Sequence, residues 1–213
     1  MDGKFFMPLI KKPFIRRTGF RDAKLIVIAS EGQKTEKKYF NDLKDTYVRS
    51  SLHVEVLERS VSASSPSHVL AHLNKFKTKY KLGRDDELWM VIDVDRWKAQ
   101  NLSDVAGKCR DKGFWIAVSN PCFELWMLLH LDEFDLYDYE QKNRLFHNSQ
   151  NFIEREIRRI LGSFNKSNPD TSKFLPHIEN AVIRAKKLDI NPNSRWPNSL
   201  GTRVYLLVEK ILY

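Results

Sequence analysis

Residues 25–32 read LIVIASEG, and this stretch decides the fold of the chain. A short, continuous apolar run that is rich in β-branched residues is typical of a strand buried on both faces of a parallel sheet. The run LWMVI at 88–92 has the same character, and the next residues include Asp93 and Asp95. Ligands of an open α/β sheet bind beyond the carboxyl ends of its strands. We therefore expect Glu31, Asp93 and Asp95 to meet at one edge of the sheet.

Strands and helices alternate through the first part of the chain. Strands are expected at 24–29, 53–57, 88–92 and 114–118, and helices are expected to begin near Thr35, Pro66, Leu102 and Pro121. This alternation predicts βαβ units with right-handed crossovers, and hence a mostly parallel, Rossmann-like sheet flanked by helices. From Asp132 onward the pattern contains no strand, and helices are expected at 150–161, 174–188 and 199–211.

The chain is expected to divide into three parts on this basis. They are a basic N-terminal arm at 1–22, an α/β domain at 23–131 and a helical C-terminal extension, packed on that domain, at 132–213. A length of 213 residues suits one domain of this kind with an extension.

The charge and composition of the chain indicate what kind of partner it binds and in which cellular compartment it works. The net charge of +9 favours nucleic acid or an anionic surface as a partner. No apolar run approaches the roughly 20 residues of a membrane-spanning helix, and the basic N-terminus lacks the apolar centre of a signal peptide. The 2 cysteines suit neither a disulfide framework nor a Cys-rich zinc site. We expect a cytoplasmic protein with no membrane partner, and the oligomeric state is left open.

Glu31 and Gly32 stand at an expected strand-to-helix turn. Glycine permits the positive φ of a tight turn, and Thr35 is placed to cap the helix that follows. Because turns are polar in general, Glu31 is either a solvated turn residue or a carboxylate that faces the cleft.

Asp93 and Asp95 are two positions apart, so their side chains lie on one side if the strand continues. Neighbouring carboxylates repel each other unless a cation lies between them. Mg²⁺ needs only one or two carboxylates, because water and phosphate oxygens complete its coordination shell. We therefore expect Mg²⁺ or Mn²⁺ at this position. The alternative is a polar loop in which Asp95 pairs with Arg96.

A third acid follows the strand expected at 114–118. In SNPCFELW at 119–126, Asn120 is expected to cap a helix, and Glu124 lies about one turn inside it. A helical side chain leans back toward the helix start, so Glu124 is either an exposed helical residue or a third carboxylate of the cleft. Carboxylates at three strand ends of a cationic chain favour metal-dependent hydrolysis of phosphodiester bonds.

Three segments resemble the signatures of the RloB-like family. They are LIVIASEGQKTEKKYF at 25–40, IDVD at 92–95 and SNPCFELW at 119–126. Weaker similarity at 164–166, 181–188 and 197–208 extends the resemblance over about 20–211.

The resemblance implies a toprim-like fold, which is the metal-binding α/β domain of topoisomerases, primases and OLD-type nucleases. It implies that Glu31 is a general acid/base or metal ligand, that Asp93 and Asp95 hold a divalent metal, and that Glu124 is a further acidic site residue. RloB-like proteins occur in bacterial defence loci, and related toprim subunits work beside ABC-type ATPases in abortive infection. The implied activity is nuclease action on tRNA, other RNA or DNA. Because the sequence around the Asp pair departs from the topoisomerase pattern, topoisomerase or primase chemistry is not implied.

Several basic and polar residues are expected to contact the nucleic acid near these carboxylates. They are Lys34, Lys38, Arg96, Asn120 and Lys166. Phosphate contacts by Lys and Arg supply most of the sequence-independent affinity for nucleic acid. Among the tryptophans, Trp97 is expected to contact the substrate, whereas Trp89, Trp115 and Trp126 are expected in the core.

A second hypothesis is a non-catalytic role. In that case the cleft binds a nucleotide or nucleic acid, and the protein is a subunit of an ATPase-containing defence complex that docks through its helical C-terminal part. Binding of a divalent metal discriminates between the two hypotheses.

Overall fold

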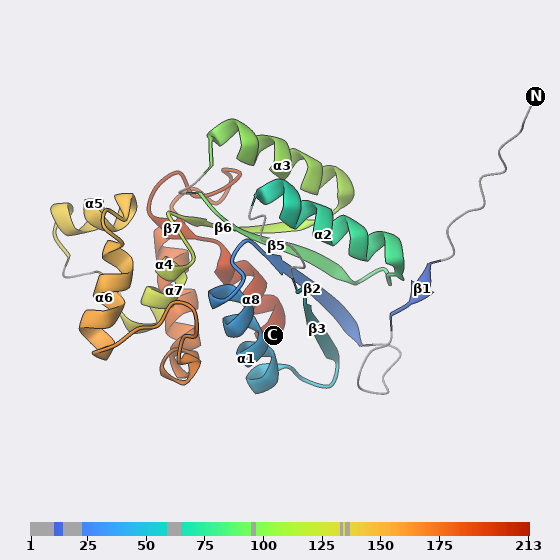
Figure 1. Ribbon diagram of the computed structural model, residues 1–213, viewed down its shortest axis with the longest axis horizontal. Helices are drawn as coiled ribbons and strands as arrows, with labels where there is room; N and C mark the ends of the chain where they lie inside the picture. The colour runs from blue at the N-terminus through green and yellow to red at the C-terminus, as the bar shows by residue number, and fades with distance from the viewer. Residues whose placement is uncertain (1–10, 15–22, 59–64, 95–96, 133, 135–136) are drawn as a thin grey trace, which may run out of the picture.

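A five-stranded sheet forms the centre of the protein (Figure 1). The computed structural model describes residues 11–14, 23–58, 65–94, 97–132, 134 and 137–213. The strands are β2 (Lys24–Ser30), β3 (Leu52–Val56), β5 (Glu87–Asp93), β6 (Trp115–Asn120) and β7 (Gly201–Thr202). Their order is β3-β2-β5-β6-β7, in which the first four are parallel and β7 is antiparallel to β6. The fold is therefore the expected Rossmann-like α/β class with a mostly parallel sheet.

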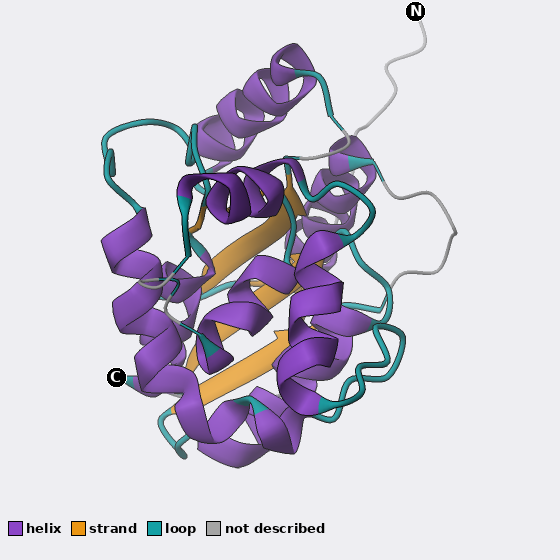
Figure 2. Cartoon of the chain, turned by 90° about the vertical axis from the view of Figure 1, so that its left-hand side faces the viewer, coloured by secondary structure: helices purple, strands orange, loops and turns teal. Residues whose placement is uncertain are grey.

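Side chains of the central strands alternate between two apolar layers. Ile26 and Ile28 point into one layer, whereas Leu25, Val27 and Ala29 point into the other. This alternation is the period of two that a strand imposes, and burial on both faces explains why the strand is apolar throughout. Figures 1 and 2 show the sheet between helices on both sides.

The two helical layers differ in size. The helices α2 (Pro66–Lys79) and α3 (Ala99–Lys112) cover one face. The other face is covered by α1 (Thr35–Tyr47), α4 (Glu124–Leu131), α6 (Phe152–Leu161), α7 (Ile178–Leu188) and α8 (Val204–Leu212). The C-terminal helices thus share one hydrophobic core with α1 and the sheet. The remaining described elements are β1 (Lys12–Pro13), β4 (Tyr80–Lys81), α5 (Tyr139–His147), and the 3₁₀ turns Thr171–Lys173 and Leu175–His177.

Local sequence explains several helix ends. Gly113 ends α3 in the left-handed region, with φ of 69°, and its N–H bonds to the Arg110 carbonyl. A non-glycine residue would be strained there, which is why glycine is preferred just after a helix. Pro66 opens α2 directly after Ser65, as expected of a first-turn proline.

Three expectations about the elements are wrong. Thr35 is not the cap of α1 but its first residue. Asn120 is not a helix cap either, because pairing with Gly201 extends β6 through it, and α4 begins only at Glu124. The expectation of no strand after Asp132 fails because the short β7 pairs with the end of β6. A pair of residues is too short for its alternation to be visible in a sequence.

A buried ion pair fixes β7 and α8 to the rest of the C-terminal region. The Arg203 guanidinium donates to both carboxylate oxygens of Asp189, at 2.9 and 3.1 Å, and to the carbonyl oxygens of Asn191 and Ser194. The Tyr205 hydroxyl also donates to Asp189, at 3.1 Å. Both charged side chains are less than a tenth exposed. A buried pair with this many hydrogen bonds strongly favours one arrangement of the chain.

Among the described residues, no helix is both long enough and apolar enough to cross a membrane. Most of the predicted basic arm at 1–22 lies outside those residues. Its described part pairs β1 with β4 in parallel, and Phe14 packs against Phe76 and Tyr80.

Candidate active site

A cavity of about 330 Å³ opens at the carboxyl edge of the sheet. It is lined by the turn from Glu31 to Glu36, by Asp93 at the end of β5, by Glu124 at the start of α4, and by Lys166. The register aligns Asp93 with Ser119 and Ser30 with Val91, so the strands end at one level. The structure therefore brings together three of the four predicted acids, from segments that are far apart in the sequence.

Glu31 is buried and held in a defined position. Its backbone N–H donates to the Val91 carbonyl at 3.0 Å, which continues the ladder between β2 and β5. Its carboxylate accepts from the indole N–H of Trp97 at 3.0 and 3.1 Å, and from the backbone N–H of Asp93 at 3.4 Å. Glu31 is thus not a solvated turn residue, and Trp97 orients this carboxylate with its N–H group.

The structure describes Asp93 of the predicted Asp pair. Asp95 and Arg96 lie outside the described residues. Asp93 is half-buried and ends β5, and it lines the cavity with Glu31. The roles of Asp95 as a metal ligand and of Arg96 as a substrate contact stay predictions.

Glu36 is a fourth carboxylate of the cavity, and the sequence reasoning did not include it. It lies in the first turn of α1, is 6% exposed, and accepts from the Gly32 N–H at 2.9 Å. A Cβ atom on Gly32 would lie 1.7 Å from a Glu36 carboxylate oxygen. The expected positive φ at Gly32 is wrong; glycine is needed here because the Glu36 carboxylate occupies the space of a side chain. The spacing of Gly32 and Glu36, one helical turn apart, is a signal that could have found it.

The protonation of Glu36 is shifted by its surroundings. Burial raises the pKa of Glu36 to about 7, because a charged carboxylate is poorly solvated there. Backbone hydrogen bonds and the charge of Lys166 oppose this rise, and the negative charge of Glu124 adds to it. Glu36 can therefore carry a proton near neutral pH in the metal-free protein.

We expect Glu36→Gln to stabilise the protein at pH 8 and to have little effect at pH 4.5. The pKa of Glu36 in the folded protein lies above its ordinary value of 4.5. The parent protein is therefore most stable below pH 4.5, where this carboxyl is protonated in both states, and it loses that stability as the pH rises through 7. Gln can still accept from the Gly32 N–H. A shift of this size corresponds to about 3 kcal/mol. Urea unfolding of both proteins in metal-free buffer across this pH range measures the difference. A difference that does not change with pH would contradict the assignment.

Lys166 connects two acids at the rim of the cavity. Its ammonium lies 2.9 Å from Glu124 and 3.3 Å from Glu154, which belongs to the first turn of α6. Partial burial lowers the pKa of Lys166, but the charges of Glu124 and Glu154 outweigh this and raise it. The Thr35 hydroxyl donates to the Lys166 carbonyl at 2.6 Å, which ties this loop to α1. The loop after α6 therefore contributes a cation to the site.

Of the predicted substrate contacts Lys34, Lys38 and Asn120, Lys34 lines the cavity and the other two do not. Lys34 is exposed and lines the cavity. Lys38 lies one turn further along α1 and pairs with Asp42 at 2.5 Å. Asn120 is buried, and its side-chain amide donates to the Pro197 carbonyl at 2.9 Å. Neither Lys38 nor Asn120 is among the residues that line the cavity.

The donor atoms of the cavity suit a hard divalent cation. Within the described ranges, no group of three or more His, Cys, Asp and Glu side chains is arranged as a complete metal site. Glu31 and Asp93 nevertheless offer adjacent carboxylates on one open cavity. This set fits Mg²⁺ or Mn²⁺, because such ions are bound by one or two carboxylates together with water and phosphate oxygens.

The family model of RloB-like proteins matches residues 26–211. The chain belongs to the RloB-like family. The match spans the sheet, the turn that carries Glu31, and the C-terminal loop that carries Lys166. No curated protein and no solved structure matches the chain.

Sequence reasoning predicted Lys166 near the carboxylates of this RloB-like site but did not predict its ion-pair partner Glu154. Glu154 and Lys166 are 12 positions apart and come from different elements, so no local spacing connects them. The hydrogen bond from the Trp97 indole N–H to Glu31, across 66 positions, was also not predicted, and the expected contact of Trp97 with substrate stays a prediction. Contacts of this range depend on the tertiary fold, and a single sequence contains no direct signal for them.

Proposed function

We propose that this RloB-like protein is a divalent-metal-dependent nuclease that hydrolyses phosphodiester bonds of RNA, with tRNA the preferred substrate class, or of DNA. The observation that carries the proposal is the meeting of Glu31, Asp93, Glu36 and Glu124 in one cavity. The net charge of +9 supports a polyanionic substrate. On this proposal Mg²⁺ or Mn²⁺ is held by Glu31 and Asp93, with Asp95 as a further ligand.

The resident side chains suit the proton transfers of hydrolysis. The metal, when bound, polarises the phosphate and stabilises its developing charge. Glu31, fixed by Trp97, accepts the proton of the attacking water as the new oxygen–phosphorus bond forms. Glu36, whose pKa burial raises to about 7 in the metal-free protein, is placed in the same cavity to donate a proton to the leaving oxygen as the old bond breaks. Lys34 at the cavity and Lys166 at its rim attract the phosphate.

We propose further that the nuclease is an effector in bacterial antiphage defence or abortive infection, acting in the cytoplasm. Family membership supports this role. An ABC-type ATPase is the partner class that fits such a role, and it would control when cleavage occurs.

The test is incubation of the purified protein with tRNA, single-stranded RNA and plasmid DNA. We expect cleavage of at least one substrate with Mg²⁺ or Mn²⁺ and none with EDTA, as followed on denaturing gels. Cleavage that is unchanged by EDTA would contradict a metal-dependent mechanism.

The alternative is a non-catalytic subunit. Lys166 already places a positive charge between Glu124 and Glu154, so these two acids are less available as metal ligands. Calorimetric titration with Mn²⁺ separates the two functions. Absence of heat from metal binding, together with tight binding of a nucleotide, would support the alternative.

A further inference from the structure

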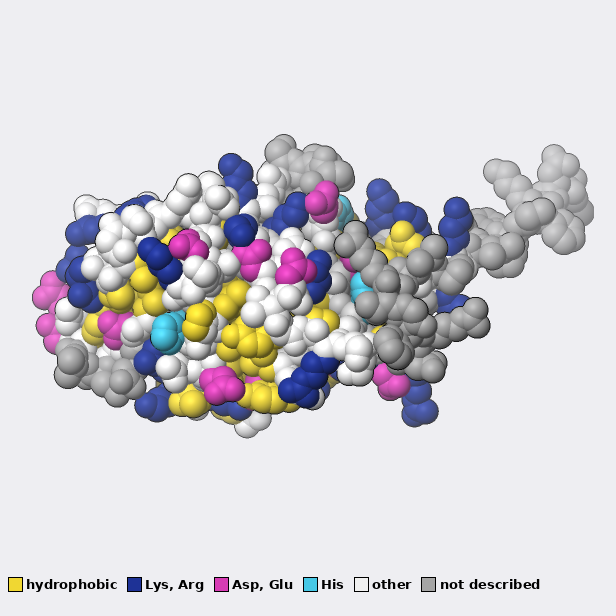
Figure 3. All heavy atoms as spheres, turned by 90° about the horizontal axis from the view of Figure 1, so that it is seen from below, with side chains coloured by type: hydrophobic (Ala, Val, Ile, Leu, Met, Phe, Trp, Pro, Cys, Tyr) yellow, Lys and Arg dark blue, Asp and Glu magenta, His cyan; other side chains and the backbone are white. Residues whose placement is uncertain are grey.

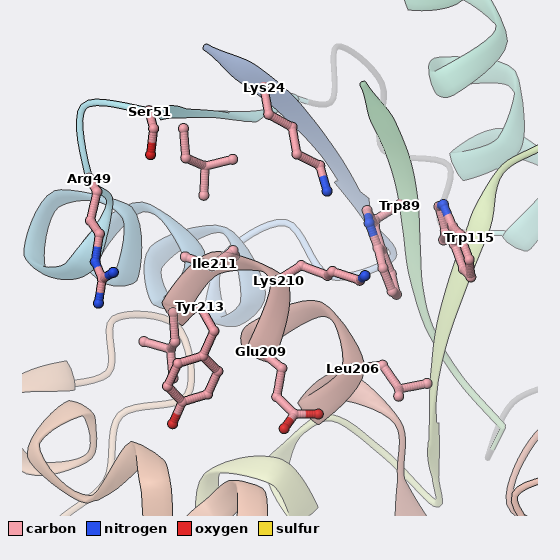
Figure 4. A pocket seen from close by; sticks show the side chains of 12 residues that line it. Lys24, Arg49, Ser51, Trp89, Trp115, Leu206, Glu209, Lys210, Ile211 and Tyr213 are labelled. Carbon is pink, nitrogen blue, oxygen red and sulfur yellow. The ribbon is translucent and has the colours of Figure 1, made fainter. Parts of the chain in front are cut away.

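A larger cavity, of about 740 Å³, lies at the opposite edge of the sheet (Figure 4). Lys24 and Trp115, the first residues of β2 and β6, form part of its wall, and α8 contributes Leu206 and Lys210. Its volume is within the range of sites that bind small molecules. Central strands of 7 residues separate it from the carboxylate cavity, which at the usual rise per residue is roughly 20 Å.

An exposed aromatic platform stands in this cavity. Trp115 is 51% exposed, although the sequence predicted it in the core. Its ring stacks on the buried Trp89 at 5.5 Å between centroids and 17° between planes. The Trp89 indole N–H donates to Glu87 at 2.8 Å, so the backing ring is fixed in orientation. Trp115 therefore offers an ordered aromatic surface to solvent.

Cations surround the platform. Figure 4 shows Lys24 and Lys210 extending toward the tryptophan pair, with Arg49 on the far side of the cavity. Lys24 is paired with Glu87 at 2.5 Å. Arg49 and Lys210 are exposed and have no ion-pair partner among the described residues. Glu209, the acid of this wall, is paired with Lys186 at 2.6 Å. The cavity thus has an excess of unneutralised positive charge.

The exposed ring of Trp115 and the exposed cations Arg49 and Lys210 favour a ligand that is both flat and anionic. On the face seen from below, a hydrophobic patch lies among Lys and Arg side chains and some Asp and Glu side chains (Figure 3). A purely apolar partner would leave Arg49 and Lys210 buried without counter-charges, which is costly. A nucleic-acid strand satisfies both features, because its bases stack on aromatic rings while Lys and Arg neutralise its phosphates.

We propose that this groove binds single-stranded nucleic acid, with one base stacked on Trp115 and phosphates near Arg49 and Lys210. The site is separate from the carboxylate cavity and does not depend on catalysis. It would hold a strand at a second point on the protein.

The test measures the fluorescence anisotropy of labelled ten-nucleotide oligo(U) and oligo(dT) in EDTA. We expect Trp115→Ala to weaken binding about tenfold, because stacking of one base is worth roughly 1–3 kcal/mol, and Trp115→Phe to retain most of the affinity. The double variant Arg49→Ala, Lys210→Ala should weaken binding. It should also reduce the slope of log association constant against log salt concentration by about 1.4, since each phosphate contact contributes roughly 0.7.

Tyr139→Ala is the matched control, because Tyr139 is 86% exposed and does not line this groove. It should bind as the parent does, and thermal unfolding should show that each variant is folded. Folded Trp115→Ala with parental affinity would overturn the proposal. A uridine mononucleotide that competes as well as the ten-nucleotide strand would overturn the assignment to a strand.

Discussion

Glu31→Gln is expected to reduce metal-dependent cleavage by about 100-fold or more, and Asp93→Asn is expected to act similarly. Removing a positioned general base typically costs this much, and each change also removes one anionic ligand from the same cavity. The substitutions preserve shape, and an amide oxygen can still accept from Trp97. Initial rates on the best substrate, at saturating Mn²⁺, measure the effect.

Glu140→Gln provides the control for these variants. Glu140 is exposed on α5 and does not line the cavity, so its substitution removes the same charge from the protein without changing the site. Its rate should equal that of the parent. If Glu31→Gln and Asp93→Asn cleave at the parental rate while folded, the assignment of the site is wrong.

Arg203→Met is expected to destabilise the protein by about 3–5 kcal/mol, because Asp189 would remain buried without its guanidinium partner. The Asp189 side chain is only 3% exposed. Without Arg203, its carboxylate would still accept a hydrogen bond from the Tyr205 hydroxyl but would have lost its positively charged partner. For a chain of this length the melting temperature should fall by roughly 6–20 °C. Thermal unfolding followed by circular dichroism measures it.

Two companion variants test the origin of that loss. Adding Asp189→Asn to Arg203→Met should recover part of the stability, because the uncompensated charge is removed. Arg195→Met is the control, since Arg195 is exposed and donates to Ser103 on the surface. We expect a change within about 0.5 kcal/mol for Arg195→Met. An equal loss in Arg203→Met and Arg195→Met would show that the buried pair contributes little.

The sheet and the position of the cavity could be predicted because both depend on local pattern. The apolar run at 25–29 lies within β2, and 88–92 lies within β5. Parallel strands bring their carboxyl ends to one edge, so Glu31 and Asp93 had to be neighbours once the strands were placed. The same argument placed Glu124, which begins the helix after β6.

The contacts that complete the cavity could not be predicted because they join segments with no shared period. Lys166 reaches Glu124 from a loop of the C-terminal region, and Trp97 reaches Glu31 from beyond β5. The exposure of Trp115 was also missed. A tryptophan at the start of an apolar strand normally suggests the core, but here α8 leaves the amino end of β6 open to the second cavity.

The most direct measurement is the anomalous difference map of a crystal soaked in Mn²⁺. We predict a peak in the cavity at the carboxyl edge of the sheet, within about 2.0–2.6 Å of carboxylate oxygens of both Glu31 and Asp93. A map with no peak there at millimolar Mn²⁺, or a peak bound only by residues outside that cavity, would contradict it.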